Sequence, residues 1–254
     1  LDGVIINDSS TTEGGQQITV KSNNSLVQNI SIKSDNRLEK AVLFTESSFS
    51  RISNIKITST RNDGRGIETS STANNITIDN ITVSIKSYSF RGSGENITLE
   101  NSTFTNNGQW TIDVYGGGPF VFYNNTFERT SSSPYSTGIF INGMNDKGAW
   151  KWRNNNFTKV PLWYIRGDHD FDESNMMDGY PIYYRTNLHG SQSSHLMVQN
   201  KTFGAFYVSD SSWIDYKNIT VKGSGSVMIL DSNNITVDEF ETRKIADPFY
   251  SSST

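Results

Sequence analysis

The sequence predicts an all-β protein in which short parallel strands wind into a solenoid. Two observations carry this prediction: a composition that disfavours helices, and a short motif that recurs along the chain. The 254 residues include 27 Asn and 35 Ser, whose side chains compete with the backbone for hydrogen bonds and favour turns over helix interiors. Aromatic residues make up 12% of the chain, so the composition is not that of a disordered protein.

The recurring motif consists of an apolar residue, any residue, an asparagine, two further residues and a second apolar or aromatic residue. The first clear copy, VQNISI, spans residues 27–32. Successive asparagines are 18 to 30 residues apart, except for one gap of 46. Alternating apolar residues at such a period are typical of β-solenoid coils. The asparagines of the eight copies are Asn29, Asn54, Asn80, Asn101, Asn124, Asn154, Asn200 and Asn218, and Glu239 replaces the asparagine in a ninth copy.

We expect these asparagines to form a ladder inside the solenoid. Equivalent residues of successive coils lie directly above one another. A buried asparagine at a bend then pairs its amide with the asparagines above and below and with the turn backbone.

A second strand precedes each motif by about ten residues, a spacing that a tight corner between two strands explains. The gap of 46 residues is about two periods, so we expect a degenerate coil near residues 175–180. The total is about ten coils, stacked at the usual distance between paired strands, about 4.8 Å. The clearest of these second strands are residues 41–44, 66–69, 111–114, 138–141, 205–208 and 227–230.

The segment DGYPIYY at residues 178–184, followed by the Asn-rich segments 196–200 and 231–237, carries a resemblance to a known family. With the coil pattern of residues 16–242, the chain resembles right-handed parallel β-helix proteins of the pectate-lyase-like repeat. More narrowly, it resembles their NosD-like and archaeal surface-protein branch. The resemblance implies a single-stranded right-handed parallel β-helix over residues 1–245. Loop insertions are expected near residues 130–148 and 158–195, and a C-terminal tail over residues 246–254.

The β-helix fold hosts lyases, hydrolases, adhesins and structural proteins, so it does not fix an activity. Polygalacturonases that resemble it carry paired aspartates and a Gly-His-Gly motif, and this sequence has neither. Arg65, Glu68 and Asp113 could converge, but isolated charges on a strand usually form a solvated face. No catalytic residue is therefore assigned.

We expect an extracellular, non-catalytic structural or adhesive surface protein, such as a self-assembling coat, sheath or filament subunit. One alternative is a carbohydrate-active enzyme, either a polysaccharide lyase or a glycoside hydrolase, and a clustered acidic and basic groove on one face would favour it. The other alternative is a sugar-binding or metal-binding accessory module.

The segment around residues 166–173 is the densest acidic patch. Asp168, Asp170 and Asp172 alternate with His169 and would supply oxygen ligands suited to Ca²⁺. The EF-hand pattern fails because Glu173 stands where that loop needs glycine. The alternative is an exposed acidic loop, and no other cofactor is expected.

Exposed aromatic side chains often mark ligand-binding surfaces. Phe122 and Trp152 occupy the inward position of the motif, so we expect them in the core. We expect Tyr123 and Trp150 to point outward, where they are candidates for binding sugar rings.

The sequence also bears on membranes, nucleic acid, localisation and self-association. No apolar run approaches the roughly 18 residues of a membrane span. The 22 Lys and Arg against 26 Asp and Glu give no basic face for nucleic acid. The start at Leu1 has no basic or apolar leader, so we expect an extracellular or cell-surface protein whose signal peptide has been removed. The unpaired strand edges at the ends of a solenoid favour end-to-end self-association.

Twelve Asn-x-Ser/Thr sequons occur in the chain, which suggests N-glycosylation. Six of them coincide with ladder asparagines, and we expect those to be too buried to carry a glycan. The remaining candidates for glycosylation are Asn7, Asn23, Asn75, Asn96, Asn156 and Asn234.

Overall fold

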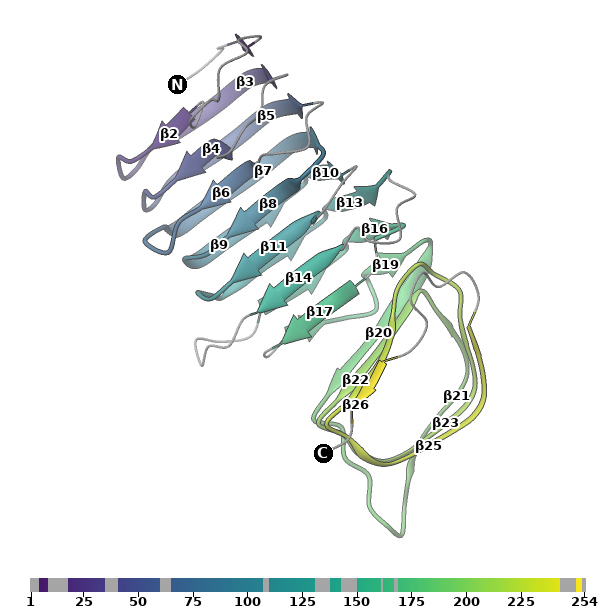
Figure 1. The fold of residues 1–254 in the computed structure, drawn as a ribbon. Coiled ribbons are helices and arrows are strands. Elements are labelled where there is room, and N and C mark those ends of the chain that lie inside the picture. The colour runs from purple at the N-terminus through teal and green to yellow at the C-terminus, as the bar shows by residue number, and fades with distance from the viewer. Residues whose placement is uncertain are drawn as a thin grey trace.

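The computed structural model consists of strands and turns arranged in two stacks of coils (Figure 1). No helix long and apolar enough to cross a membrane occurs in the part of the chain that the structure describes. The structure describes residues 5–8, 18–34, 41–59, 65–106, 110–130, 138–142, 150–160, 162–166, 169–242 and 250–252.

The first stack has one face made by a seven-stranded parallel sheet. Each of these strands begins one coil, as the alternating apolar residues of the sequence predict. In chain order the strands are β2 (Ile18–Val20), β4 (Ala41–Thr45), β6 (Arg65–Thr69), β8 (Tyr88–Gly92), β11 (Ile112–Tyr115), β14 (Ile139–Asn142) and β17 (Leu162–Arg166).

The motif strands form the rest of the first stack and belong to a sheet of 16 strands. The short strand β1 (Ile5–Asp8) and three long strands, β3 (Leu26–Ser34), β5 (Arg51–Ser59) and β7 (Asn74–Ile85), are followed by coils in which the motif is split into two short strands. The strands before the split are β9 (Glu95–Glu100), β12 (Phe120–Tyr123), β15 (Trp150–Arg153) and β18 (His169–Phe171); those after it are β10 (Thr103–Asn106), β13 (Thr126–Arg129), β16 (Asn156–Thr158) and β19 (Met176–Met177).

The second stack contains the remaining strands. One side comprises β20 (Tyr180–Thr186), β22 (Ala205–Ser209), β24 (Val227–Leu230) and β26 (Tyr250–Ser252), and the other side is a three-stranded sheet of β21 (Leu196–Phe203), β23 (Ser212–Val221) and β25 (Asn233–Thr242). Within the described residues, seven coils in the first stack and three in the second agree with the expected total of about ten. β26 belongs to the expected tail and pairs with β24 in parallel.

A hairpin joins the two stacks where the sequence suggested a degenerate coil. β19 and β20 are antiparallel, and the turn between them is Asp178-Gly179, whose φ angles of 50° and 83° are both positive. This dipeptide favours a two-residue hairpin turn. The expected single solenoid is therefore divided, and residues 162–186 of the expected insertion form β17 to β20 instead of a loop.

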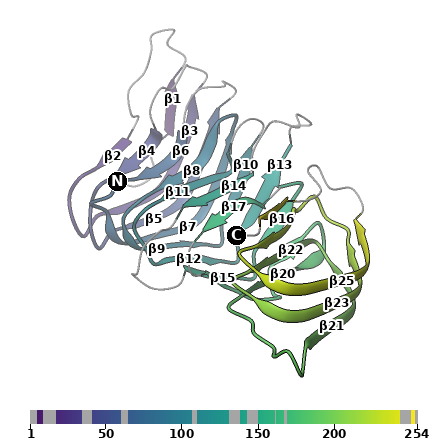
Figure 2. The ribbon, with the colours of Figure 1, turned by 60° about the horizontal axis from the view of Figure 1, so that its bottom comes forward.

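The second stack closes one end of the first. In Figure 1 the coils of the second stack are seen nearly end-on while those of the first lie side by side, and in Figures 1 and 2 β21, β23 and β25 curve on the side away from the first stack. Tyr184 and Tyr207 belong to the same buried cluster as Phe171 of the first stack. The other faces of these strands, including Tyr183 and Phe206, build a separate second core. Strands β20 and β22 are thus buried on both faces.

The asparagine ladder is present, but its burial was predicted wrongly. Asn54 donates to Asn29 Oδ1 at 3.1 Å, Asn80 to Asn54 Oδ1 at 2.7 Å, and Asn124 to Asn101 Oδ1 at 2.9 Å. All of these side chains are exposed. The reason is the backbone: all eight motif asparagines, and also Glu239, have φ between 50° and 57°. A left-handed residue interrupts the strand alternation, and asparagine adopts this conformation more readily than most residues.

The buried asparagines occupy the next position in the motif. Asn125, Asn155 and Asn175 are at most 1% exposed. Asn125 donates to Asn155 Oδ1 at 3.1 Å, and Asn155 donates to Asn175 Oδ1 at 2.8 Å. Each of the three also donates to a backbone carbonyl of the coil before its own. This inner ladder satisfies the backbone at the kink of the last coils of the first stack.

Candidate active site

The outer face of the seven-stranded sheet brings three charged side chains into one column. Strand alternation directs Glu68, Arg91 and Asp113 outward, because the residues beside them in sequence, such as Ile67 and Ile112, are fully buried in the core. The strand register places Glu68 opposite Arg91 and Arg91 opposite Asp113. Residues 23 and 22 positions apart in sequence thereby become neighbours.

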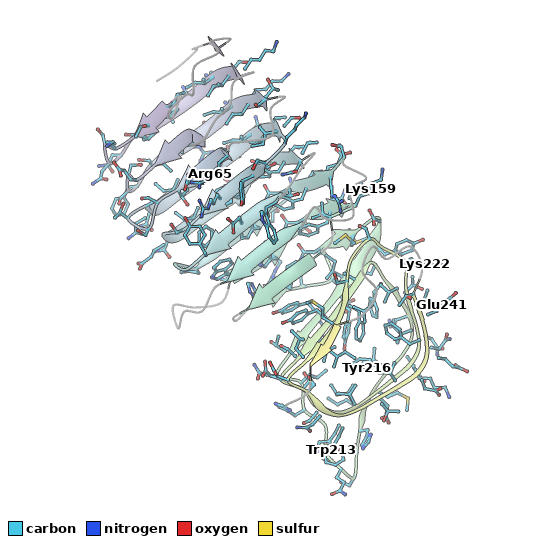
Figure 3. The ribbon with its side chains drawn as sticks, viewed as in Figure 1. Arg65, Lys159, Trp213, Tyr216, Lys222 and Glu241 are labelled. Atoms are coloured by element: carbon cyan, nitrogen blue, oxygen red, sulfur yellow. The ribbon has the colours of Figure 1, made fainter. Side chains whose placement is uncertain are left out.

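Ion pairs connect this column. Arg91 Nε lies 3.1 Å from Asp113 Oδ2, and Arg91 Nη1 lies 3.9 Å from Glu68 Oε1. Arg65, which lies over the same sheet in Figure 3, donates from Nη1 to both carboxylate oxygens of Glu68 at 2.7 Å. The side chains of Glu68 and Asp113 are only 11% and 13% exposed. The expectation of a solvated face is therefore wrong for these residues, because their neighbours exclude most of the water.

Burial raises the pKa of Asp113 above its ordinary value of 3.8. Desolvation is the largest cause, and Glu68 adds to it, while Arg91 and Arg65 act in the opposite direction without cancelling it. A carboxyl group with a raised pKa retains its proton at higher pH, which is the property required of a general acid.

An aromatic wall and an open depression adjoin the charges. The Arg91 guanidinium lies 4.7 Å from the centre of the Tyr115 ring and 5.8 Å from that of Tyr88. Tyr115 remains 37% exposed, so part of its ring is accessible to a ligand. The depression has a volume of about 470 Å³ and lies where β6, β8 and β11 end, lined by Glu68, Ser70, Ser93, Glu95, Tyr115 and Gly116 among others.

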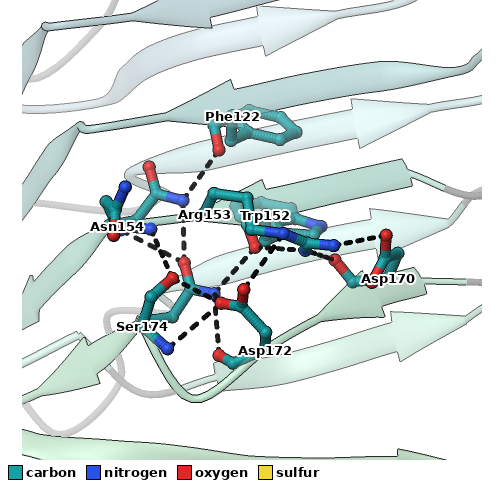
Figure 4. A network of polar contacts seen from close by, with 9 residues as sticks. Phe122, Trp152, Arg153, Asn154, Asp170, Asp172 and Ser174 are labelled. Atoms are coloured by element: carbon teal, nitrogen blue, oxygen red, sulfur yellow. Dashed lines mark hydrogen bonds and ion pairs between the residues drawn. The ribbon is translucent and has the colours of Figure 1, made fainter.

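The acidic segment that suggested Ca²⁺ is bound by arginine instead (Figure 4). Arg153 Nη2 lies 2.5 Å from Asp170 Oδ2, and Arg153 Nε lies 3.0 Å from Asp172 Oδ2. His169 is 7% exposed and accepts a long hydrogen bond of 3.4 Å from Trp152 Nε1. Asp168 lies outside the described residues. Among the residues that the structure describes, no three His, Asp or Glu side chains are grouped closely enough to hold a metal ion.

The two candidate aromatic residues differ. Tyr123 is 43% exposed, as predicted, and the register places it beside Glu100 and Arg153. The prediction for Trp150 is wrong: this side chain is 3% exposed and packs against Phe120, with 4.9 Å between ring centres. Trp150 is two residues from Trp152, so strand alternation places both on the same inner face.

The candidate glycosylation sites with described side chains are all exposed: Asn23, Asn75, Asn96, Asn156 and Asn234. The side chain of Asn7 lies outside those described. The six sequons on the ladder are exposed as well, so burial gives no reason to exclude them. Glycosylation itself stays a prediction.

Comparisons with known proteins define the class of the molecule. Residues 2–127, about half of the chain, match the family model described as the right-handed beta helix region. With the parallel coils, this match places the chain among the right-handed β-helix proteins, as the resemblance predicted. The narrower likeness to NosD-like and archaeal surface proteins stays a prediction.

No curated protein matches the sequence. Among solved structures, a tailspike protein, gp49 from Acinetobacter baumannii bacteriophage Fri1, described as a capsular polysaccharide depolymerase, aligns at 12% identity with a TM-score of 0.34. The alignment covers 94% of this chain and 56% of that protein, so this chain spans little more than half of its length. The fold assignment rests on the family model and on the coils.

Proposed function

We propose that this chain is a carbohydrate-active enzyme, a glycoside hydrolase that cleaves a polysaccharide between Glu68 and Asp113. The observation that supports it is the convergence of two outward-facing, largely buried carboxylates on Arg91, beside an exposed ring and an open depression. Removing charged groups from water is costly. A site that binds sugars and acts on them gives a reason for that cost, whereas a solvated surface does not.

The backbone spacing of Glu68 and Asp113 fits an inverting hydrolase. Glu68 and Asp113 lie on strands two positions apart, with β8 between them, which corresponds to about 9.5 Å between backbones. Inverting glycosidases hold their carboxyl groups about 6.5–9.5 Å apart, leaving room for a water molecule, whereas retaining enzymes need about 5–5.5 Å.

The roles follow from the surroundings of each carboxyl group. Asp113, whose pKa is raised, donates its proton to the glycosidic oxygen as the bond between that oxygen and the anomeric carbon breaks. Water attacks the anomeric carbon from the opposite face, and Glu68, ion-paired with Arg65, accepts the proton of that water. A lyase would need a free base, whereas Arg65 and Arg91 are both engaged with the carboxyl groups of Glu68 and Asp113.

The test is depolymerisation of a panel of neutral, amino and uronic polysaccharides, measured as reducing ends released. Asp113→Asn and Glu68→Gln should each lower the rate at least 100-fold, a typical effect of losing a general acid or base. Asp79→Asn is the matched control, because Asp79 also pairs with an arginine, Arg51, but in the 16-stranded sheet. The proposal is rejected when the parent protein cleaves nothing, or when Asp113→Asn is as active as the parent.

A second candidate is an extracellular, self-assembling surface subunit, and an edge strand supports it. β25 pairs only with β23 within the described residues, and most of its ten residues are exposed. An unpaired strand edge can add a strand from another copy of the chain. Sedimentation velocity should then show oligomers that Val237→Lys, a charge placed on this strand, dissociates. A parent protein that stays monomeric at 100 μM, a concentration chosen for the test, contradicts this candidate.

A further inference from the structure

The depression beside Glu68 has the size and position of a sugar-binding subsite. Its volume of about 470 Å³ lies within the range of about 300–1,000 Å³ that is usual for small-molecule sites. It lies where three successive coils turn, at the ends of β6, β8 and β11, and Glu68 and Tyr115 form part of its wall. A polysaccharide unit placed here is therefore next to the proposed site of cleavage.

Two glycines that line the depression after β11, Gly116 and Gly117, have different roles. A side chain on Gly117 would place its Cβ 1.9 Å from the carbonyl oxygen of Gly94, so the close approach of two coils requires glycine there. Gly116 is different, because a Cβ at this position would meet no atom within 4 Å. Gly116 lines the depression, and a side chain there would not press on the neighbouring coil.

The charge of the lining selects among sugars. Two carboxylates, Glu68 and Glu95, line the depression, and none of the described residues that line it is Lys or Arg. Arg65 and Arg91 lie beside the depression and are bound to Glu68 and Asp113. A uronic acid unit would bring a further carboxylate beside Glu68 and Glu95 while both neighbouring arginines are already bound to carboxylates, which like-charge repulsion disfavours.

We infer that this depression is a subsite for one unit of the polysaccharide, that the unit is a neutral or amino sugar and not a uronic acid, and that Gly116 sets its size. The inference rests on the proposed function for the presence of a polysaccharide and adds the class of sugar. The hydroxyls of Ser70 and Ser93 and the backbone of the glycine corner supply hydrogen-bond partners for sugar hydroxyls.

The experiment measures binding to the Asp113→Asn protein, which retains the depression but lacks the proposed acid. The probes are immobilised oligosaccharides in three groups: neutral, amino and uronic. We expect the tightest binder to be neutral or amino, and Gly116→Asn, made in the same background, to weaken its binding at least tenfold. Asparagine suits the substitution because it tolerates the φ of 64° at this position.

The matched control is Gly179→Asn. Gly179 also has a positive φ, of 83°, and open space around its Cβ position, but it lies in the hairpin between β19 and β20. This variant should bind as the Asp113→Asn parent does. The inference is overturned by a uronic oligosaccharide as the tightest binder, by unchanged binding in Gly116→Asn, or by no binding of any probe.

The outcomes separate the inference from the proposed function. Asp113-dependent cleavage of a uronic polysaccharide would keep the hydrolase and reject the subsite. Gly116-sensitive binding of a neutral or amino oligosaccharide that the parent protein does not cleave would keep the subsite and reject the hydrolase.

Discussion

The two stacks use the outer faces of their strands in opposite ways. In the first stack, β6, β8 and β11 present Glu68, Arg91 and Asp113 on the outside of the coil. In the second stack, the equivalent face of β20 and β22 presents Tyr184 and Tyr207, whose rings stack with 4.6 Å between centres against the end of the first stack. The outer face of the coil is therefore polar and charged where it is open to solvent. It is apolar where the other stack covers it.

The difference between the two stacks can be seen in the sequence of their strands. Residues 66–69, GIET, place a charge between isoleucine and threonine, whereas residues 205–208, AFYV, form an unbroken apolar run. A continuous apolar run is typical of a strand buried on both faces. Comparing outer-face residues therefore shows which face of a solenoid is available to a ligand.

The largest effect should come from the covered face. Tyr207→Ala should lower the free energy of unfolding by about 3 kcal/mol, because it removes a buried ring from the junction and leaves a cavity. Tyr115→Ala, on the open face, should lower it by less than about 0.5 kcal/mol. Urea denaturation of both variants measures the two effects, and equal losses would contradict the assignment of open and covered faces.

The inner asparagine ladder predicts the next effect. Asn155→Ala leaves the carbonyl of Phe122 without its side-chain donor and the backbone N–H of Asn125 without its side-chain acceptor, and unsatisfied buried groups cost about 1–3 kcal/mol. Asn154→Ala removes an exposed left-handed asparagine, for which a loss of about 1 kcal/mol is expected. Urea denaturation again compares the two, and a larger loss in Asn154→Ala would reverse the assignment of inner and outer ladders.

The strand positions and most of the core could be predicted from the sequence, because alternation follows directly from strand geometry. Ile52, Ile57, Phe122 and Trp152 are all fully buried, as the motif predicts. The ladder asparagines were predicted to be buried and are exposed. The prediction was wrong because a residue in the left-handed conformation reverses the alternation of inward and outward side chains along the strand. The hairpin at Asp178-Gly179 was missed although that dipeptide is a strong turn signal.

The candidate site could not be assembled from the sequence. Its members are 23 and 22 residues apart, and turns of different length lie between them, so only the register of the finished sheet shows that they are neighbours. The site also includes Arg65, which binds Glu68, and Tyr88 and Tyr115, which contact Arg91, and these three residues come from three different coils.

A smaller effect should appear in the pH dependence of stability. The folded-state pKa of Asp113 is raised, so the folded protein binds more protons than the unfolded chain, and stability falls as the pH rises from the ordinary value towards the raised one. Asp113→Asn removes this ionisation. The stability of the variant relative to the parent should therefore increase from about pH 4 to pH 7 in urea denaturation. A relative stability that decreases over this range would contradict the raised pKa.

The smallest expected effect is that of Ca²⁺. Because Arg153 already binds Asp170 and Asp172, millimolar Ca²⁺ should change the Tm of the protein by less than about 1 °C, since only a ligand that binds the folded state stabilises it. Mg²⁺ at the same concentration is the control for ionic strength. A rise of several degrees with Ca²⁺ alone would show a site that the ion pairs of Arg153 do not reveal.

The central claim is that Glu68 and Asp113 form an inverting hydrolytic site, and the anomeric form of the first product tests it most directly. Proton NMR during cleavage of the polysaccharide found in the panel records that form before the sugar equilibrates in water. We expect a first product of inverted configuration, formed by the parent and by Asp79→Asn and absent with Asp113→Asn. A product of retained configuration, or one that Asp113→Asn forms at the parental rate, would contradict it.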